Sequence, residues 1–304
     1  MQVFVTGSSG FLGRHLCAHL EAGGNSVVKA NSKNCELTQD HSLEKFNDRK
    51  YDLIFHLAAW TRAGEFSATH GGEQWIVNQQ ININVLAWWQ RNQPQAKLVA
   101  LGTSVCYAKG SELVEEKYLD GLPIDRFYSY AMTKRMLLVG LQTLHQQFDL
   151  NYLYAIPSTL YGPGYHTDGR PMHFIFDLIR KMIRGKEFGE DVVLWGDGYQ
   201  KREVVFLPDF VKLLHQLAES HDNDLVNIGA GEEFTIRHFA QLICEIVGYP
   251  VSKVEYDASR YVGARSKCLS IKKIQSILPP FELTPLRQGL EQTVKWFYEA
   301  NAYL

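Results

Sequence analysis

The sequence predicts an α/β fold, in which a doubly wound parallel sheet carries a smaller C-terminal α/β lobe that binds the substrate. Short apolar segments alternate with segments of helical length over about the first 160 residues, which is typical of consecutive βαβ units. A glycine-rich loop joins the first apolar segment to the first helical one. Beyond this part, glycine and proline interrupt the pattern more often, which indicates a second lobe.

Residues 1–160 are expected to form a dinucleotide-binding domain. We expect its strands at Gln2–Thr6, 25–30, 52–57, 97–102 and 151–156, and its helices at 11–21, 42–46, 73–93 and Tyr128–Phe148. Residues 161–304 are expected to form the substrate lobe, with some crossing of the chain between the two parts. Its helices are expected at 172–184, 208–219, Ile236–Val247 and 286–300.

The composition excludes several classes of protein. Of the 304 residues, 45% are hydrophobic and 21% charged, so the chain can bury a core and is not disordered. The formal net charge of −2 argues against a broad basic face for nucleic acid. Five scattered cysteines without a CxxC pair argue against a disulfide framework or a metal site. With no apolar run of roughly 18 residues and no signal peptide, we expect a cytoplasmic protein without membrane contact.

The glycine loop reads Gly7-Ser-Ser-Gly10-Phe-Leu-Gly13 and stands between the first predicted strand and the first predicted helix. A diphosphate at a helix N-terminus must approach the backbone N–H groups closely, and a Cβ atom at Gly7 or Gly10 would obstruct that approach. Gly13 lets the helix pack tightly on the strand. The loop therefore predicts a dinucleotide site. Its expected members are Gly7, Ser9, Gly10, Phe11, Leu12 and Gly13.

The end of the second predicted strand indicates which dinucleotide binds. Proteins that prefer NAD usually carry Asp or Glu there, and this carboxylate binds the ribose 2′-hydroxyl. The present sequence has Asn31-Ser32-Lys33 instead, with no carboxylate before Glu36. We expect Ser32 and Lys33 to bind a 2′-phosphate, which favours NADP(H) over NAD.

Tyr130 and Lys134 are four residues apart in a predicted helix, so both side chains lie on one face. The ammonium group lowers the free energy of ionising the phenol, and we expect Tyr130 to exchange a proton with a substrate oxygen near neutral pH. Tyr249 and Lys253 have the same spacing, but Pro250 interrupts any helix there. The first pair is therefore the candidate for catalysis.

The chain resembles the extended short-chain dehydrogenase/reductase family, also called the NAD-dependent epimerase/dehydratase family, whose core is the Rossmann fold. The GxxGxxG spacing of the loop is the form found in that family. Several further motifs are similar to those of the GDP-L-fucose synthases, which epimerise and reduce a GDP-linked 4-keto-6-deoxy sugar with NADPH. These motifs are Leu101-Gly-Thr-Ser, Leu160-Tyr-Gly-Pro163, Met172-His-Phe-Ile and Trp195-Gly-Asp-Gly198.

The resemblance implies an NADPH-dependent reductase of a nucleotide-linked 4-keto-6-deoxy sugar, with or without epimerase activity, that forms a homodimer. The implied catalytic residues are Thr103, which hydrogen-bonds the substrate carbonyl, Tyr130, which protonates it, Lys134, and His173, an acid in epimerisation. The implied cofactor contacts beyond the loop and Ser32 and Lys33 are Leu57, Ala58, Ala59, Leu101, Lys134, Pro157 and His173. The implied contacts of the nucleotide sugar, with a GDP-sugar favoured, are Thr103, Ser104, Lys181, Trp195, Arg202 and Lys267.

One position departs from the family's pattern. The family's epimerisation cysteine lies two residues after the catalytic Ser or Thr, where this sequence has Val105. Cys106 follows, but neighbouring side chains of a strand point to opposite faces. Unless a bulge re-aims it, we expect Cys106 to be a buried apolar residue. Reduction is therefore better supported than epimerisation.

Two other functions remain open. A nucleotide-sugar epimerase or dehydratase with tightly held NAD would use the same pair of Tyr130 and Lys134. A dehydratase usually carries an Asp-Glu pair after the catalytic Thr, and this sequence has Ser104-Val105 there. A dinucleotide-sensing protein without catalytic activity would usually have lost the Tyr or the Lys, and this chain has both.

Overall fold

The computed structural model describes residues 1–260 and 263–304. The chain forms two compact units. Unit 1 comprises Met1–Pro157, Phe210–Ile228 and Ser270–Pro280, and unit 2 comprises Ser158–Asp209, Gly229–Leu269 and Phe281–Leu304. The chain leaves unit 1 after Pro157, close to the division expected at residue 160, and later returns to it twice.

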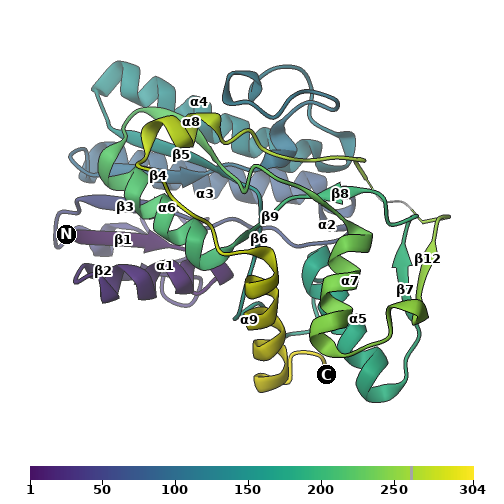
Figure 1. The fold of residues 1–304 in the computed structure, drawn as a ribbon. Coiled ribbons are helices and arrows are strands. Elements are labelled where there is room, and N and C mark those ends of the chain that lie inside the picture. Colours follow the sequence, from purple (N-terminus) through teal and green to yellow (C-terminus); the bar gives the residue numbers. More distant parts are fainter. Residues whose placement is uncertain (261–262) are drawn as a thin grey trace. The chain divides into compact units, whose positions relative to one another are not determined.

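The described strands of unit 1 form one six-stranded parallel sheet (Figure 1). Their order is β10 (Asp224–Ile228), β5 (Tyr152–Pro157), β4 (Lys97–Leu101), β3 (Leu53–His56), β1 (Gln2–Thr6) and β2 (Ser26–Ala30). Because β1 lies between β2 and β3, the chain crosses first to one side of β1 and then to the other. Such a switch point leaves a crevice for a ligand at the carboxyl edge of the sheet. The prediction of a doubly wound parallel sheet is confirmed.

Helices cover both faces of this sheet (Figure 1). On one face α3 (Gly71–Asn92) packs beside α4 (Tyr128–Phe148). On the other lie α1 (Phe11–Ala22) and α6 (Leu207–Ser220), joined by an imidazole pair, His19 Nε2 to His215 Nδ1 at 3.2 Å. The shorter helices are α2 (Phe66–Thr69), α8 (Lys272–Ile277), and the 3-10 helices η1 (Glu44–Phe46), η2 (Ser104–Cys106), η3 (Glu115–Lys117) and η4 (Asp125–Phe127). Since both faces are covered, the central strands are apolar along their length.

The structure differs from the sequence prediction at several elements of unit 1. The expected helix at 42–46 is only the 3-10 turn η1, and α2 was not predicted. β10 was not predicted because it is short and contains Asp224 and Asn227. Asn227 is nevertheless wholly buried, since its amide donates to the carbonyls of Leu113 and Ser270 and accepts from Tyr107. Tertiary hydrogen bonds thus place a polar residue in a core strand.

Unit 2 contains three two-stranded pairs among its described residues. The parallel pairs are β6 (Thr159–Tyr161) with β9 (Val204–Phe206) and β7 (Val192–Trp195) with β12 (Val254–Asp257), and the antiparallel pair is β8 (Lys201–Arg202) with β11 (Phe234–Thr235). Its helices are α5 (Phe174–Phe188), α7 (Ile236–Val247), α9 (Leu286–Glu299) and the 3-10 helix η5 (Val251–Lys253). α7 packs against both α5 and α9. The predicted smaller α/β lobe is confirmed.

A buried carboxylate organises the loops of unit 2. Glu203 is 3% exposed, and its side chain accepts hydrogen bonds from the N–H groups of Ala230 (2.6 Å), Gly231 (2.8 Å) and Leu269 (2.9 Å). A Cβ atom at Gly229 would collide with this carboxylate. Burial raises the pKa of Glu203, and the N–H donors oppose that shift. Glu203 therefore joins its own segment, between β8 and β9, to the backbone at residues 230–231 and at Leu269. This role is structural.

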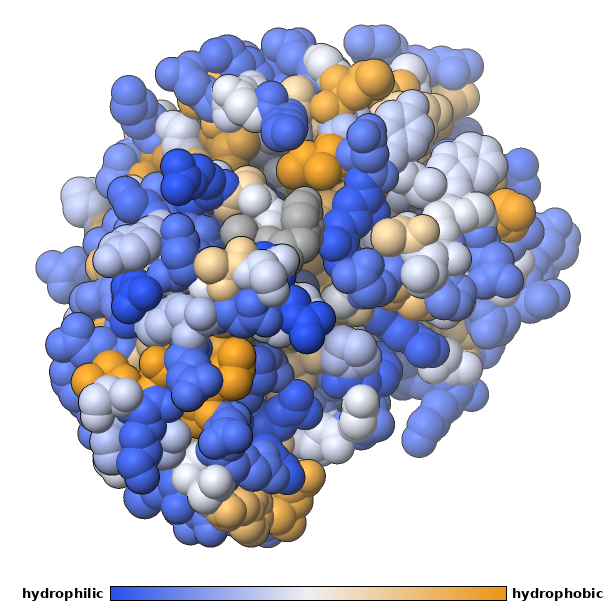
Figure 2. All heavy atoms as spheres, turned by 90° about the vertical axis from the view of Figure 1, so that its right-hand side faces the viewer, coloured by the Kyte–Doolittle hydropathy of each residue, from blue (hydrophilic) through white to orange (hydrophobic). Residues whose placement is uncertain are grey.

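No helix of the described residues is long and apolar enough to cross a membrane. The face shown in Figure 2 is mostly hydrophilic, and its hydrophobic side chains lie in small separate groups.

Candidate active site

The glycine loop connects β1 to α1, as predicted. Gly7 has a φ of +64°, a left-handed conformation that favours glycine, and a Cβ atom there would lie 2.8 Å from the backbone nitrogen of Ala58. Gly10 stands at the N-cap of α1, and glycine has no side chain to occupy the helix end. At Gly13 a Cβ atom would collide with the carbonyl oxygen of Gly7 and the backbone of Ser8. The glycines therefore keep backbone close to backbone at a helix N-terminus.

The same loop is tied to β2. The hydroxyl of Ser8 donates to the carbonyl of Ala30 at 3.0 Å, and its N–H donates to the same oxygen at 3.1 Å. After Ala30 the chain turns through Asn31, whose side-chain oxygen accepts the N–H of Lys33 at 3.0 Å. Ser32 and Lys33 are exposed. Both side chains are thus accessible beside the loop end of β2, where the sequence predicts contact with a 2′-phosphate.

A buried polar network joins the ends of β1 and β3 to the helices. Thr6 Oγ1 lies 3.0 Å from His56 Nδ1, and His56 Nε2 lies 3.1 Å from Asn82 Oδ1. The amide of Asn82 donates to the carbonyl of Thr133 at 3.4 Å. Burial lowers the pKa of His56 to about 4, with the positive charge of Lys134 contributing. The imidazole is therefore neutral at pH 7, and a proton on Nε2 satisfies both of its partners.

The predicted cofactor residues of unit 1 lie at consecutive strand ends. Thr6 Oγ1 accepts the N–H groups of Leu57 (3.1 Å) and Ala58 (3.2 Å), which fixes the loop after β3. Leu101 is the last residue of β4 and Pro157 the last of β5. Since all these strands are parallel, their carboxyl ends share one edge of the sheet with the glycine loop and the half-buried Ala59.

Tyr130 and Lys134 lie in the first turns of α4, and the ammonium nitrogen is 6.0 Å from the centre of the phenol ring. Lys134 is 5% exposed, and burial lowers its pKa to about 8. Burial raises the pKa of Tyr130, Cys106 raises it further, and a hydrogen bond with Thr61 opposes the shift. Desolvation therefore keeps the phenol protonated at neutral pH in the protein alone. The exchange of a proton between Tyr130 and a substrate oxygen stays a prediction.

Thr103 and Ser104 follow β4, as predicted, but the strand does not continue through them. Thr103 caps η2, and its hydroxyl accepts the N–H of Val105 at 3.4 Å. The argument from strand alternation at Cys106 is therefore wrong, because residues 104–106 form a 3-10 turn. Its outcome nevertheless holds. Cys106 is wholly buried, and its thiol donates to the carbonyl of Ala131 at 3.3 Å.

Tyr249 and Lys253, the second pair with a spacing of four residues, do not lie in one helix. α7 ends at Val247, and Gly248 follows with a φ of +79°. Tyr249 lies outside that helix, and Lys253 ends the short η5. The prediction that these two residues do not share a helix face is confirmed.

The remaining predicted residues belong to unit 2. His173 is the N-cap of α5. The residue is exposed, and desolvation together with the positive charges of His166 and Lys267 lowers its pKa. Its imidazole is therefore neutral at pH 7 and can accept a proton. To act as the acid that the resemblance implies, His173 must first take up that proton.

The side chains predicted to contact the sugar nucleotide differ in their exposure and in their hydrogen bonds to the rest of the protein. Lys181 donates to the carbonyl of Val193 at 3.0 Å and pairs with Asp177 at 3.1 Å. Arg202 donates to the carbonyl of Ala264 at 2.7 Å. Trp195 is 53% exposed, with the Arg260 guanidinium 5.7 Å from its ring centre. These contacts leave the predicted roles open, and of these three side chains Trp195 presents the largest free surface.

The sequence analysis missed the buried residues that support the predicted site residues. Ser8 donates to the carbonyl of Ala30, and His56 is hydrogen-bonded to Asn82. Thr61 is hydrogen-bonded to Tyr130. His56 had one usable signal: an ionisable residue that ends an apolar strand needs buried partners. Asn82 and Thr61 had none, because their partners lie far away in the sequence.

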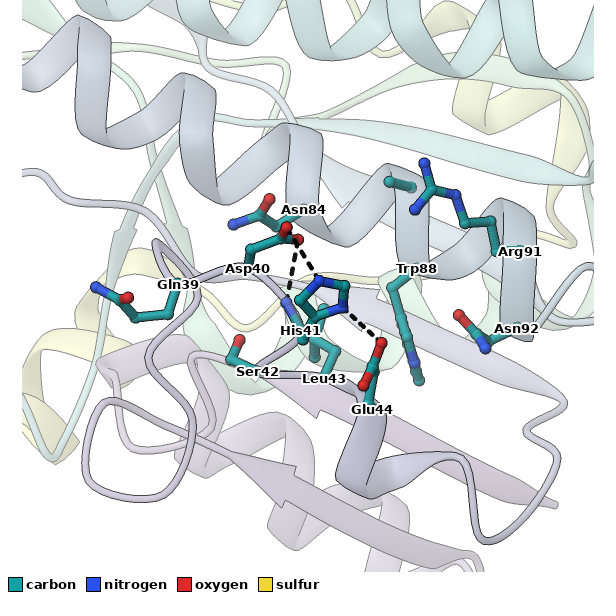
Figure 3. Close-up of a pocket in the computed structure, with 11 residues that line it drawn as sticks. Gln39, Asp40, His41, Ser42, Leu43, Glu44, Asn84, Trp88, Arg91 and Asn92 are labelled. Atoms are coloured by element: carbon teal, nitrogen blue, oxygen red, sulfur yellow. Dashed lines mark hydrogen bonds and ion pairs between the residues drawn. The ribbon is translucent and has the colours of Figure 1, made fainter.

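A pocket in unit 1 lies away from all predicted residues, between α3 and the segment that follows β2 (Figure 3). Its lining residues include Asp40, His41, Glu44, Trp88 and Arg91. His41 Nδ1 is 2.6 Å from Glu44, and this hydrogen bond raises the pKa of His41. Asp40 and Glu44 are thus both paired with His41.

Residues 3–229 match the NAD dependent epimerase/dehydratase family. The chain belongs to this family. It is 29% identical over 307 aligned residues to a probable GDP-L-fucose synthase 1 of Oryza sativa subsp. japonica, covering 98% of this chain and 92% of that protein. It is 26% identical to a dTDP-4-dehydro-6-deoxy-D-allose reductase of a Streptomyces species, covering 97% and 95%. The crystal structure of a GDP-L-fucose synthetase from Naegleria fowleri bound to NADP has the same fold, with a TM-score of 0.86 at 22% identity over 99% and 94% of the two chains.

Proposed function

We propose that the protein is an NADPH-dependent reductase of a nucleotide-linked 4-keto-6-deoxy sugar. The observation that carries this proposal is the placement of Thr103 after β4 and of Tyr130 and Lys134 on one turn of α4, within the unit that holds the glycine loop. The names of the relatives agree in substrate class but differ in the base, GDP in one and dTDP in the other. A GDP-sugar is the substrate we favour.

The glycine loop fits a dinucleotide. Gly10 at the N-cap of α1 makes no side-chain cap hydrogen bond, and backbone N–H groups at a helix N-terminus are suited to bind a diphosphate. Residues 11–14 contain no carboxylate that would repel it. Ser32 and Lys33 would hold the 2′-phosphate, and Lys134 the nicotinamide ribose. When bound, NADPH supplies the hydride that reduces the keto carbon.

The protein's own residues supply the proton and polarise the carbonyl. The raised pKa of Tyr130 keeps its phenol protonated, which suits a proton donor. The hydroxyl of Thr103 would donate to the same substrate oxygen as negative charge develops on it. Lys134 is charged below a pH of about 8 and stabilises the tyrosinate that remains after proton transfer.

Epimerisation should be weak. Moving a proton across a sugar carbon requires a base on one face and an acid on the other. Val105 has no exchangeable proton. The thiol of Cys106 is buried and donates a hydrogen bond to the carbonyl of Ala131. His173, neutral at pH 7, can supply one of the two groups. We propose a reductase with reduced epimerase capacity.

The exposed faces of α3 and α4 support the proposal of a homodimer. Trp75, Ile76 and Ile83 on α3 and Met136 on α4 are 45%, 53%, 60% and 46% exposed. These two helices pack side by side, and a second copy that covers them would bury these exposed apolar side chains. Sedimentation equilibrium would give twice the 34.7 kDa of the chain, and a monomer would contradict it.

The test of the proposed activity is oxidation of NADPH, followed by absorbance, with 4-keto-6-deoxy sugars linked to GDP, dTDP and UDP. We expect turnover with at least one of them and the highest kcat/KM with the GDP-sugar. If the protein binds NADPH but oxidises it with none of the three sugars, the proposed activity is contradicted and a dinucleotide sensor is favoured.

A further inference from the structure

Two buried tyrosines connect the backbone of Thr103 to the backbone of Lys134. The N–H of Thr103 donates to Tyr118 Oη at 3.2 Å, Tyr118 Oη lies 3.1 Å from Tyr154 Oη, and Tyr154 Oη donates to the carbonyl of Lys134 at 2.7 Å. Each hydroxyl has one proton. Since Tyr154 gives its proton to Lys134, Tyr118 must donate to Tyr154. The chain therefore runs in one direction, from Thr103 to Lys134, and both phenol protons have an acceptor.

The pair has little freedom to move. Tyr118 is 1% exposed and Tyr154 wholly buried, and their rings meet edge to face at 5.7 Å between centroids. The end of β4 is shaped around them. A Cβ atom at Gly102 would lie 2.6 Å from Tyr118 Oη and 2.6 Å from Cε1 of Tyr154. Glycine at this position lets the two phenols stand directly against the strand end that carries Thr103.

The phenols join segments that are distant in sequence. Tyr118 belongs to the loop after η3, Tyr154 to β5, Thr103 to the end of β4 and Lys134 to α4. We infer that Tyr118 and Tyr154 are positioning residues that fix Thr103 relative to Lys134 before any ligand binds. This inference rests on the proposed function for its catalytic consequence. A shift of about 1 Å between reacting groups can slow catalysis by roughly a hundredfold, so a fixed separation of these two residues matters for the rate.

Neither phenol is a catalytic residue in this account, because their hydroxyls are consumed within the protein. Their proposed effect differs from that of ordinary core packing. Removing the Tyr118 hydroxyl leaves the rings and the apolar contacts in place but frees the Thr103 N–H. Removing the Tyr154 hydroxyl takes away the acceptor of the Tyr118 proton and leaves the Lys134 carbonyl with its helical partner alone. A buried donor without an acceptor is unfavourable, and the segment that bears it will shift to find water or another partner.

Tyr107 offers a matched control. It is 2% exposed, its ring centre is 5.2 Å from that of Tyr118, and its hydroxyl donates to Asn227 Oδ1 at 2.8 Å. Tyr107→Phe therefore removes a buried phenol hydroxyl beside the pair and leaves the Thr103–Lys134 connection complete. A purely structural role predicts similar behaviour of all three Tyr→Phe variants.

The experiment compares Tyr118→Phe, Tyr154→Phe and Tyr107→Phe in the full chain. In the protein without ligand, Tyr118→Phe should speed hydrogen exchange of the Thr103 amide at least about tenfold, and Tyr107→Phe should not. Tyr154→Phe should raise the Kd for NADPH, measured by fluorescence titration, by about threefold to tenfold, because α4 then loses its hydrogen bond to β5 at the residue that bears the Lys134 side chain. With an accepted keto sugar, both variants of the pair should lower kcat about tenfold and leave the KM for the sugar within twofold.

The inference is overturned if Tyr118→Phe and Tyr107→Phe lower the melting temperature equally while exchange at Thr103, the Kd for NADPH and kcat stay at the values of the unmodified protein. Should Tyr118→Phe fail to fold, Tyr154→Phe breaks the same connection at the Lys134 end and decides the question. If the unmodified protein reduces no keto sugar, the proposed function fails. Amide exchange and NADPH affinity would still support or refute the positioning role.

Discussion

The hydroxyl of Thr6 lies 3.0 Å from Nδ1 of His56, so the last residues of β1 and β3 are joined by their side chains. The same hydroxyl accepts the N–H groups of Leu57 and Ala58. Its own proton must therefore go to His56, which requires an unprotonated Nδ1. One buried neutral imidazole thus holds the two loops that meet at the switch point, and its protonation would break the arrangement.

We predict that this network makes the fold acid-sensitive. The pKa of His56 is about 4 in the folded protein against an ordinary 6.5, so the unfolded chain binds the extra proton first. The contribution of His56 is complete above pH 6.5 and is lost as the pH falls toward 4. The free energy of unfolding should drop by roughly 2–3 kcal/mol over that window. Urea unfolding at several pH values measures it. A similar drop in His56→Gln would show that other groups cause it.

Gly13→Ala should destabilise the protein strongly. The added methyl group would meet the carbonyl of Gly7 and the backbone of Ser8, which cannot move as a side chain can. We expect a loss of about 3 kcal/mol or more, together with loss of NADPH binding. Gly72→Ala is the control, because a Cβ atom there meets open space in helix α3; it should be neutral or stabilise by about 0.5–1 kcal/mol. Equal melting temperatures of the two variants would refute the packing argument.

The preference for NADPH should depend on Lys33. A carboxylate there would repel a 2′-phosphate, so Lys33→Glu should lower the affinity for NADPH relative to NADH by about tenfold or more, which corresponds to about 1.4 kcal/mol. Lys50→Glu makes the same charge change before β3, at the amino end of the sheet, and should have no effect. Isothermal titration with both dinucleotides decides. Tighter binding of NADH by the unmodified protein would show that the end of β2 was misinterpreted.

The features that depend on local backbone geometry could be predicted from the sequence. Glycine spacing predicted the loop after β1, and the i,i+4 pair of Tyr130 and Lys134 predicted one face of α4. Such patterns are short in sequence and rest on sterics. The parallel arrangement of the sheet also followed from the βαβ alternation, although β10, whose polar Asn227 is buried through distant partners, was not predicted.

What the sequence could not supply were interactions between distant segments and the detail of turns. The 3-10 turn at Ser104–Cys106 exists because the Thr103 hydroxyl accepts the N–H of Val105, an alternative that competes with extending the strand. The pKa of Tyr130 is raised chiefly by burial, which the spacing to Lys134 does not reveal. The tyrosine pair behind Thr103 joins four separate elements, and periodicity carries no trace of it.

Epimerisation should be restricted to fewer carbons than in GDP-L-fucose synthase. The reaction on a 4-keto-6-deoxy sugar nucleotide in D2O should place little deuterium at C3 and C5 of the product, as measured by NMR. His173→Asn should reduce what remains, because one of the two required groups is then lost. Efficient uptake at both carbons, abolished by Cys106→Ser, would show that the buried thiol reaches the substrate and would contradict the account of Val105 and Cys106.

In the proposed reaction, a hydride is transferred to the keto carbon and Tyr130 protonates the carbonyl oxygen. The most direct measurement uses NADPH deuterated at the transferred position and a nucleotide-linked 4-keto-6-deoxy sugar, with the product examined by NMR. We expect deuterium at C4 of the sugar. We also expect that Tyr130→Phe slows the reaction about a thousandfold with an unchanged Kd for NADPH, whereas Tyr128→Phe, an exposed tyrosine two residues earlier on α4, keeps full activity. An absence of deuterium at C4 with every nucleotide sugar tested, or near-normal turnover by Tyr130→Phe, would contradict the proposed reaction.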